Sequence, residues 1–112
     1  MAKPTNRAFS RHNLEALEVL PQMIRVGRIE RKMSAQEVAN RAGISRPLLR
    51  RIENGDPSCG IGSVFEVAVL TGVPLFGGEP DRIETQRSVL TEKLTLLPQR
   101  ARKPRRRIRD DF

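Results

Sequence analysis

The feature that most constrains the fold is a break of three residues, Gly43, Ile44 and Ser45, between two segments with helical signals. Ser34 followed three residues later by Glu37 is a capping-box pattern, which predicts that a helix begins just after Ser34. Gly43 predicts the end of that helix, because glycine readily takes the left-handed conformation of a helix C-terminus. Ser45 is a favourable N-cap for the next helix. Two short helices joined by so short a link must cross at a sharp angle.

Apolar and small residues in these two segments have the spacing of helices that pack against each other. Val38, Ala39 and Ala42 share one side of the first helix, and Leu49 and Ile52 share one side of the second. The small Ala39 allows the two backbones to approach closely. Two helices joined by a short glycine-containing turn form a helix-turn-helix, whose second helix can enter the major groove of DNA.

The opposite side of the second helix is rich in arginine. At about 100° per residue, burying Leu49 and Ile52 turns the other side of this helix towards solvent. The predicted base contacts are the residues on or next to that side: Arg46, Pro47, Arg50 and Arg51. Arginine can bind guanine O6 and N7, and the proline ring can contact a thymine methyl group. We expect no acidic partner for these arginines within the chain. The alternative interpretation is a solvated face with a purely structural role.

The remaining segments also predict helices, with no strand pattern and no internal repeat, so the expected class is all-α. A five-helix helix-turn-helix domain is expected over residues 13–76, followed by an additional C-terminal helix within 77–98. A flexible arm (1–12) and a basic disordered tail (99–112) flank them. Pro21 is expected to start a new helix, because proline suits the first helical turn. In that helix Ile24, Ile29 and Met33 should face inwards.

Charge and composition limit the classes of function that the chain can have. The net charge is +8, and seven basic residues follow Leu97, which favours a polyanionic partner such as DNA. A single cysteine, Cys59, and the lack of a signal segment predict a cytoplasmic protein. No apolar run approaches the ~20 residues that span a bilayer. His12 is the only histidine, so we expect no metal site, no cofactor and no enzymatic activity.

Residues 24–76 resemble the Cro/C1-type (XRE) helix-turn-helix family, through IRVGRIERKMSAQEVANRAGISRPLLRRIENGD and VFEVAVLTGVPLF. The resemblance implies that Arg28 pairs with Glu53 and so positions the second helix of the motif. It also implies a set of residues that hold DNA phosphates: Ser34, Ala35, Gln36, Ser45 and Asn54. Pro47 departs from the family pattern, because polar residues that read bases are common at its position.

A closer resemblance is to the HipB-like antitoxins encoded beside HipA-type kinase toxins. It depends on RIERKMSAQEVANRAGISR, RIENGDP, IGSVFEVA, GVPLF, LLPQR and the terminal DDF. The resemblance implies a homodimer that represses its own operon at a palindromic operator on the bacterial nucleoid and binds a HipA-like Ser/Thr kinase toxin. The alternatives are a stand-alone XRE-type regulator, a protein that mainly neutralises a toxin and binds DNA weakly, and a basic tail that binds RNA.

Overall fold

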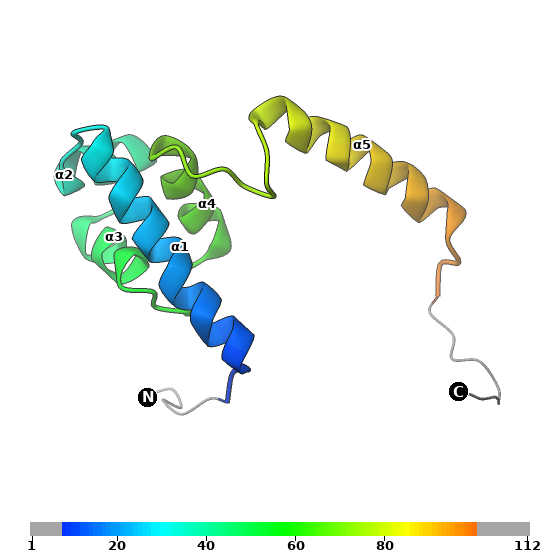
Figure 1. Cartoon of the computed structure of the whole chain (residues 1–112), viewed down its shortest axis with the longest axis horizontal. Helices are drawn as coiled ribbons and strands as arrows, with labels where there is room; N and C mark the ends of the chain where they lie inside the picture. Colours follow the sequence, from blue (N-terminus) through cyan, green and yellow to red (C-terminus); the bar gives the residue numbers. More distant parts are fainter. Residues whose placement is uncertain (1–7, 101–112) are drawn as a thin grey trace. The chain divides into compact units, whose positions relative to one another are not determined.

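The computed structural model describes residues 8–100, which contain five α-helices and no strand. The helices are α1 (Arg11–Glu30), α2 (Ala35–Ala42), α3 (Arg46–Glu53), α4 (Ile61–Leu70) and α5 (Pro80–Leu96) (Figure 1). The expected all-α class is confirmed. Most of the predicted N-terminal arm and nearly all of the predicted basic tail lie outside the described residues.

The first helix is longer than expected. A single helix, α1, runs through Pro21, so the prediction that Pro21 starts a new helix is wrong. It begins where Ser10 Oγ accepts a hydrogen bond from the Asn13 N–H at 3.2 Å. Proline removes the hydrogen bond that would reach the Leu17 carbonyl oxygen. Gly55 packs at this place, so closely that a Cβ atom on it would overlap the same oxygen. The buried Pro21 is therefore accommodated by packing from the loop after α3.

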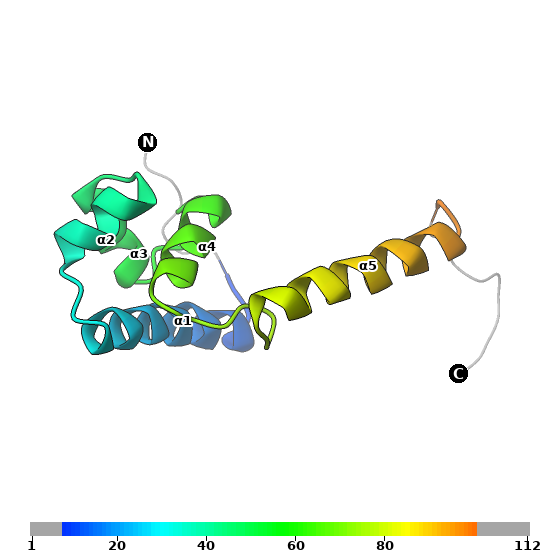
Figure 2. The same cartoon turned by 90° about the horizontal axis from the view of Figure 1, so that it is seen from above.

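A small aliphatic core holds α1 to α4 together. Figure 2 shows α2, α3 and α4 grouped on the same side of α1. The buried apolar residues come from α1 to α4 and from the loops that follow α1 and α4: Ile24, Met33, Val38, Ala39, Leu49, Ile52, Val67, Ala68 and Val73. The inward positions expected for α2 and α3 are confirmed, with Ala42 partly buried against this core. At about 25 cal/mol per Å² of apolar surface removed from water, this cluster supplies the main stabilisation.

Ile29 does not belong to that core, contrary to the sequence prediction. Its side chain is 62% exposed, whereas Ile24 is fully buried. Five residues at about 100° each separate the two side chains by roughly 140° around the helix. Gly27 and Arg28 occupy the buried and half-buried positions on that end of α1 instead.

Gly27 allows α1 to approach the end of α4 very closely. A Cβ atom at this position would overlap the carbonyl oxygen of Thr71, which caps α4. Thr71 is fully buried, and its hydroxyl donates to the Val67 carbonyl at 2.8 Å. The Arg31 guanidinium donates to the Thr71 carbonyl oxygen at 3.0 Å. A backbone contact and an arginine thus connect α1 to the end of α4.

The chain divides into two units, Met1–Gly77 and Gly78–Phe112. The first contains α1 to α4. The second contains α5, which starts after Glu79 and ends at Leu96, inside the segment 77–98 in which a helix was expected. The apolar residues in the second half of α5 are largely exposed.

Candidate nucleic-acid interface

The starts of α2 and α3 and the turn between these helices have the expected caps. Ser34 Oγ accepts from the Glu37 N–H at 3.0 Å, and Ser45 Oγ accepts from the Leu48 N–H at 3.2 Å. Gly43 has φ 70°, the left-handed conformation predicted for it. The Ile44 N–H then reaches back to the Ala39 carbonyl at 3.0 Å. Satisfying the exposed groups at both helix ends fixes α3 relative to α2.

The inner side of α3 is anchored and its outer side is open. Leu49 and Ile52 are buried in the core. Pro47 lies in the first turn of α3 and does not interrupt the helix. The four residues predicted to contact bases, Arg46, Pro47, Arg50 and Arg51, are all exposed. The exposed side of α3 is therefore basic and also carries the apolar ring of Pro47.

Arg46 is connected to the start of α2. Its Nη1 donates to Gln36 Oε1 at 3.3 Å, and Gln36 Nε2 donates to Asn40 Oδ1 at 2.9 Å. Gln36 was predicted to hold a phosphate and Arg46 to contact a base. The structure places these two side chains together. Arg50, in contrast, has no polar side-chain partner among the described residues, so its guanidinium is available to a ligand.

The other residues predicted to hold phosphates lie at helix ends. Ser34, Ser45 and Asn54 are exposed, and Ala35 is partly buried. The first N–H groups of α2 have no acceptor within the helix, and such groups bind anions. Because Gln36 contacts Arg46, the start of α2 and the start of α3 lie on the same side of the unit.

Arg51 differs from the prediction, because it has an acidic partner. Its Nε lies 3.0 Å from Asp56 Oδ2, and its Nη2 donates to Ser58 Oγ at 3.0 Å. Asp56 Oδ1 accepts from both the N–H and the hydroxyl of Ser58, at 2.8 and 2.7 Å. Gly55, with φ 77°, reverses the chain after α3, so the Asp56 N–H returns to the Arg51 carbonyl at 3.0 Å. This reversal brings together groups that are far apart on an extended chain.

Charge and hydrogen bonding in this loop support each other. The hydrogen bonds from Ser58, followed by the one from Arg51, hold the pKa of Asp56 well below its usual range. The hydrogen bond to Asp56 raises the pKa of Arg51. Burial raises the pKa of the nearby Cys59 thiol. At neutral pH the loop therefore contains a carboxylate that orients a cationic side chain of α3.

Replacing Asp56 by asparagine tests whether the orientation of Arg51, and not only its positive charge, contributes to sequence preference. In Asp56→Asn we expect affinity for random DNA to rise slightly, because one negative charge next to the predicted DNA-contacting side of α3 is lost. The preference for a sequence selected from random DNA, relative to random DNA itself, should fall about fivefold, because Arg51 is no longer held in place. Competition binding against both DNAs measures the two effects. Asp81→Asn, which removes an exposed acid from α5, is the control, and equal preference in both variants would contradict the role of Asp56.

The expected pair between α1 and α3 is present. Arg28 Nε lies 2.8 Å from Glu53 Oε2, and its Nη2 lies 3.3 Å from Oε1. Arg28 Nη1 also donates to the Met33 carbonyl at 3.2 Å. The two side chains are only 18% and 12% exposed. This bidentate contact fixes the end of α3 to the end of α1 with defined geometry.

The described residues contain no group of three or more His, Cys, Asp or Glu residues arranged to hold a metal ion. None of their helices combines the length and the apolar character required to cross a membrane.

Comparison with known proteins adds one match. Residues 24–77, just under half of the chain, match the family model described as Helix-turn-helix. No curated protein and no solved structure matches the chain. The matched segment begins in the second half of α1 and includes all of α2, α3 and α4.

Proposed function

We propose, from the premise that residues 24–77 form a DNA-binding helix-turn-helix domain of the Cro/C1 type, that this chain is a sequence-specific transcriptional repressor. The observation that carries the proposal is the outer side of α3. Three exposed arginines lie there, while Leu49 and Ile52 anchor the inner side. A helix with this arrangement can lie in the major groove without disturbing the core.

The individual side chains have different roles in this proposal. Arg50 reads a base directly, because its guanidinium has no other polar side-chain partner among the described residues. Arg46 reads a base next to a phosphate held by Gln36, to which it is hydrogen-bonded. Pro47 contacts a thymine methyl group, since it has no donor to offer. Arg51 enters the groove in an orientation set by Asp56.

Phosphate contacts determine the register of the domain on DNA. We assign them to the N-terminal ends of α2 and α3 and to the end of α3: Ser34, Ala35, Gln36, Ser45 and Asn54. The N–H groups at the start of α2 favour an anion through their own partial charge. These contacts contribute affinity on any DNA sequence, whereas the α3 side chains distinguish one sequence from another.

A homodimer on a palindromic operator completes the repressor. One domain of this size presents one recognition helix and therefore covers one half-site. Two copies place two such helices in major grooves about one helical turn apart. We propose that the protein acts on DNA in the cytoplasm and is non-enzymatic, as helix-turn-helix proteins usually are.

The arginines of α3 provide the direct test of base reading. Arg50→Ala should weaken binding to a sequence selected from random DNA by about 1 to 3 kcal/mol, and relax preference at one position of each half-site. Arg25→Ala, which removes an exposed arginine from α1, is matched in charge and should weaken all DNA sequences alike. Selection with each variant, followed by sequencing, measures the preference. Equal loss on selected and random DNA for Arg50→Ala would contradict base reading.

The antitoxin role is the narrower form of the proposal, and it rests on the HipB-like resemblance of the sequence. A kinase toxin encoded by the neighbouring gene should then co-purify with this chain and lower or raise its affinity for the operator. A chain that binds its operator but captures no such kinase is a stand-alone XRE-type regulator. A chain that captures the kinase yet binds DNA weakly is mainly a toxin-neutralising protein.

A further inference from the structure

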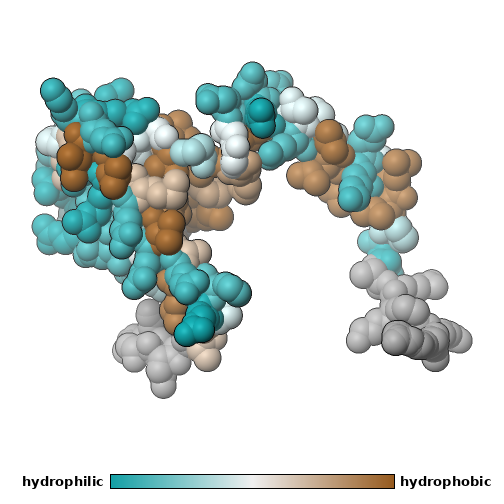
Figure 3. All heavy atoms as spheres, viewed as in Figure 1, coloured by the Kyte–Doolittle hydropathy of each residue, from teal (hydrophilic) through white to brown (hydrophobic). Residues whose placement is uncertain are grey.

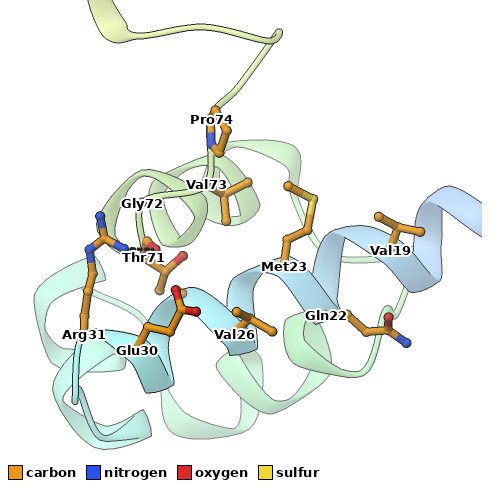
Figure 4. A pocket seen from close by; sticks show the side chains of 11 residues that line it. Val19, Gln22, Met23, Val26, Glu30, Arg31, Thr71, Gly72, Val73 and Pro74 are labelled. Atoms are coloured by element: carbon orange, nitrogen blue, oxygen red, sulfur yellow. Dashed lines mark hydrogen bonds between the residues drawn. The ribbon is translucent and has the colours of Figure 1, made fainter.

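An apolar groove of about 400 Å³ runs along the exposed side of α1. Its floor contains Val19, Met23 and Val26, called the α1 row below, which are 52%, 41% and 53% exposed. Val73 and Pro74 form the opposite wall, and Figure 4 shows Met23 pointing from α1 towards Val73. Exposed apolar rows of this kind mark interaction sites. Neither DNA phosphates nor bases would favour this surface.

The second apolar row lies on α5. Leu90, Leu94 and Leu97, called the α5 row, are 57%, 67% and 47% exposed. Figure 3 shows hydrophobic residues on the second half of α5 and along α1. Leu90 and Leu94, four residues apart, share one face of α5, and Leu97 follows three residues later as the C-cap of the helix. Leaving the exposed part of these three leucines in water is unfavourable, because removal of apolar surface from water stabilises a contact.

The two rows match in spacing and in flanking charge. The α1 row also has spacings of four and three, so two parallel helices would bring Val19 opposite Leu90 and Met23 opposite Leu94, with Val26 near Leu97 at the C-cap. In that alignment Arg87 falls beside Glu15, where α5 enters the contact. Both charged residues are exposed. Opposite charges therefore border the apolar contact at this end.

We propose that the α5 row of a second copy of this chain docks on the α1 row, and that each copy gives its α5 to the other. This inference rests on the homodimer of the proposed function. In a reciprocal exchange the α5 row of each copy covers the α1 row of the other, which gives two equivalent contacts related by two-fold symmetry. Such an arrangement is closed, so it forms a dimer and not a filament. None of the residues that line the groove belongs to α3.

Cross-linking between differently tagged copies tests the exchange. With Cys59→Ser as background, Val19→Cys is introduced in one copy and Leu90→Cys in the other, and the two are mixed under oxidising conditions. We expect a disulfide between the two tags, because paired positions bring Cα atoms to the 4.4–6.8 Å that a disulfide requires. Neither variant alone should cross-link. Val69→Cys, an exposed valine on α4, replaces Val19→Cys as the control and should give no bond.

A second measurement uses the full chain without cysteines. Leu94→Glu and Met23→Glu should each raise the dimer dissociation constant about tenfold or more by sedimentation, because each places a charge in an apolar contact. Val69→Glu should leave it unchanged. A bond that forms only when both cysteines lie on one monomeric copy, or a dimer unaffected by either glutamate, would overturn the exchange.

Binding to DNA that carries a single half-site separates this inference from the proposed function. If the exchange is correct, Leu94→Glu retains half-site binding and loses the added affinity for two half-sites. Half-site binding with no cross-link overturns the exchange and leaves the function intact. A cross-linked dimer without any sequence preference supports the exchange and contradicts the function.

Discussion

Replacing Glu53 by alanine is expected to lower the free energy of unfolding by about 3 kcal/mol, because it leaves the half-buried Arg28 guanidinium without its charged partner. The loss includes the bidentate contact at 2.8 and 3.3 Å that connects α3 to α1. For a domain of 60–100 residues, 1 kcal/mol corresponds to roughly 4–8 °C in melting temperature. Thermal unfolding followed by circular dichroism should therefore show a fall of more than 10 °C.

Glu37→Ala is the matched control for Glu53. It removes the same type of side chain from an ion pair with Arg41 that spans 3.5 Å and is about half exposed at both residues. Exposed pairs of this kind are worth a few tenths of a kcal/mol. Replacing both Arg28 and Glu53 by apolar residues of similar size should recover much of the stability, because no buried charge is then left unpaired. Equal melting temperatures for Glu53→Ala and Glu37→Ala would show that the pair is only a surface contact.

The parts of the fold that could be predicted from sequence depend on local rules. Ser34, Gly43 and Ser45 act on backbone groups within five residues of themselves, so their caps can be recognised without knowing the rest of the chain. The buried sides of α2 and α3 follow from the helical period in the same way. Together these features limit α3 to one exposed side, which is why its arginines could be named in advance.

The acidic partner of Arg51 could not be found by the same rules. Asp56 follows Arg51 by five residues, which places it outside any continuous helical face. The contact exists because Gly55 reverses the backbone at φ 77°. The Asn54-Gly55 dipeptide after Glu53 was the available signal in the sequence, because glycine permits such a reversal. Its consequence for a side chain one turn earlier depends on the three-dimensional path of the loop.

At Pro21 a local preference was recognised correctly, but packing of a distant loop overrides it. Proline does favour the first turn of a helix, yet here α1 continues through it. The missing hydrogen bond lies where Gly55 packs against Leu17. A loop more than thirty residues away in sequence therefore decides whether a local rule applies. Distant packing of this type cannot be inferred from the periodicity of one segment.

The second large effect is expected for Gly27→Ala. The sign of the change in the free energy of unfolding distinguishes helix propensity from packing. Helix propensity alone predicts that Gly27→Ala stabilises the protein by about 1 kcal/mol. The structure predicts the reverse, because the new Cβ would overlap the Thr71 carbonyl oxygen, which belongs to the backbone and cannot rotate away. Overpacking at a close helix contact costs typically 1–3 kcal/mol. We expect the free energy of unfolding to fall by about 2 kcal/mol, measured by denaturant titration.

Gly62 provides the matched substitution, since it is the other glycine within α1 to α4 and a Cβ added there meets nothing within 4 Å. Gly62→Ala should therefore raise the free energy of unfolding by up to about 1 kcal/mol. The same chemical change then has opposite effects at two helical positions. If Gly27→Ala also stabilised the protein, α1 would not approach α4 as closely as the backbone contact requires. Opposite signs would instead identify Gly27 as the residue that allows α1 to pack closely against the end of α4.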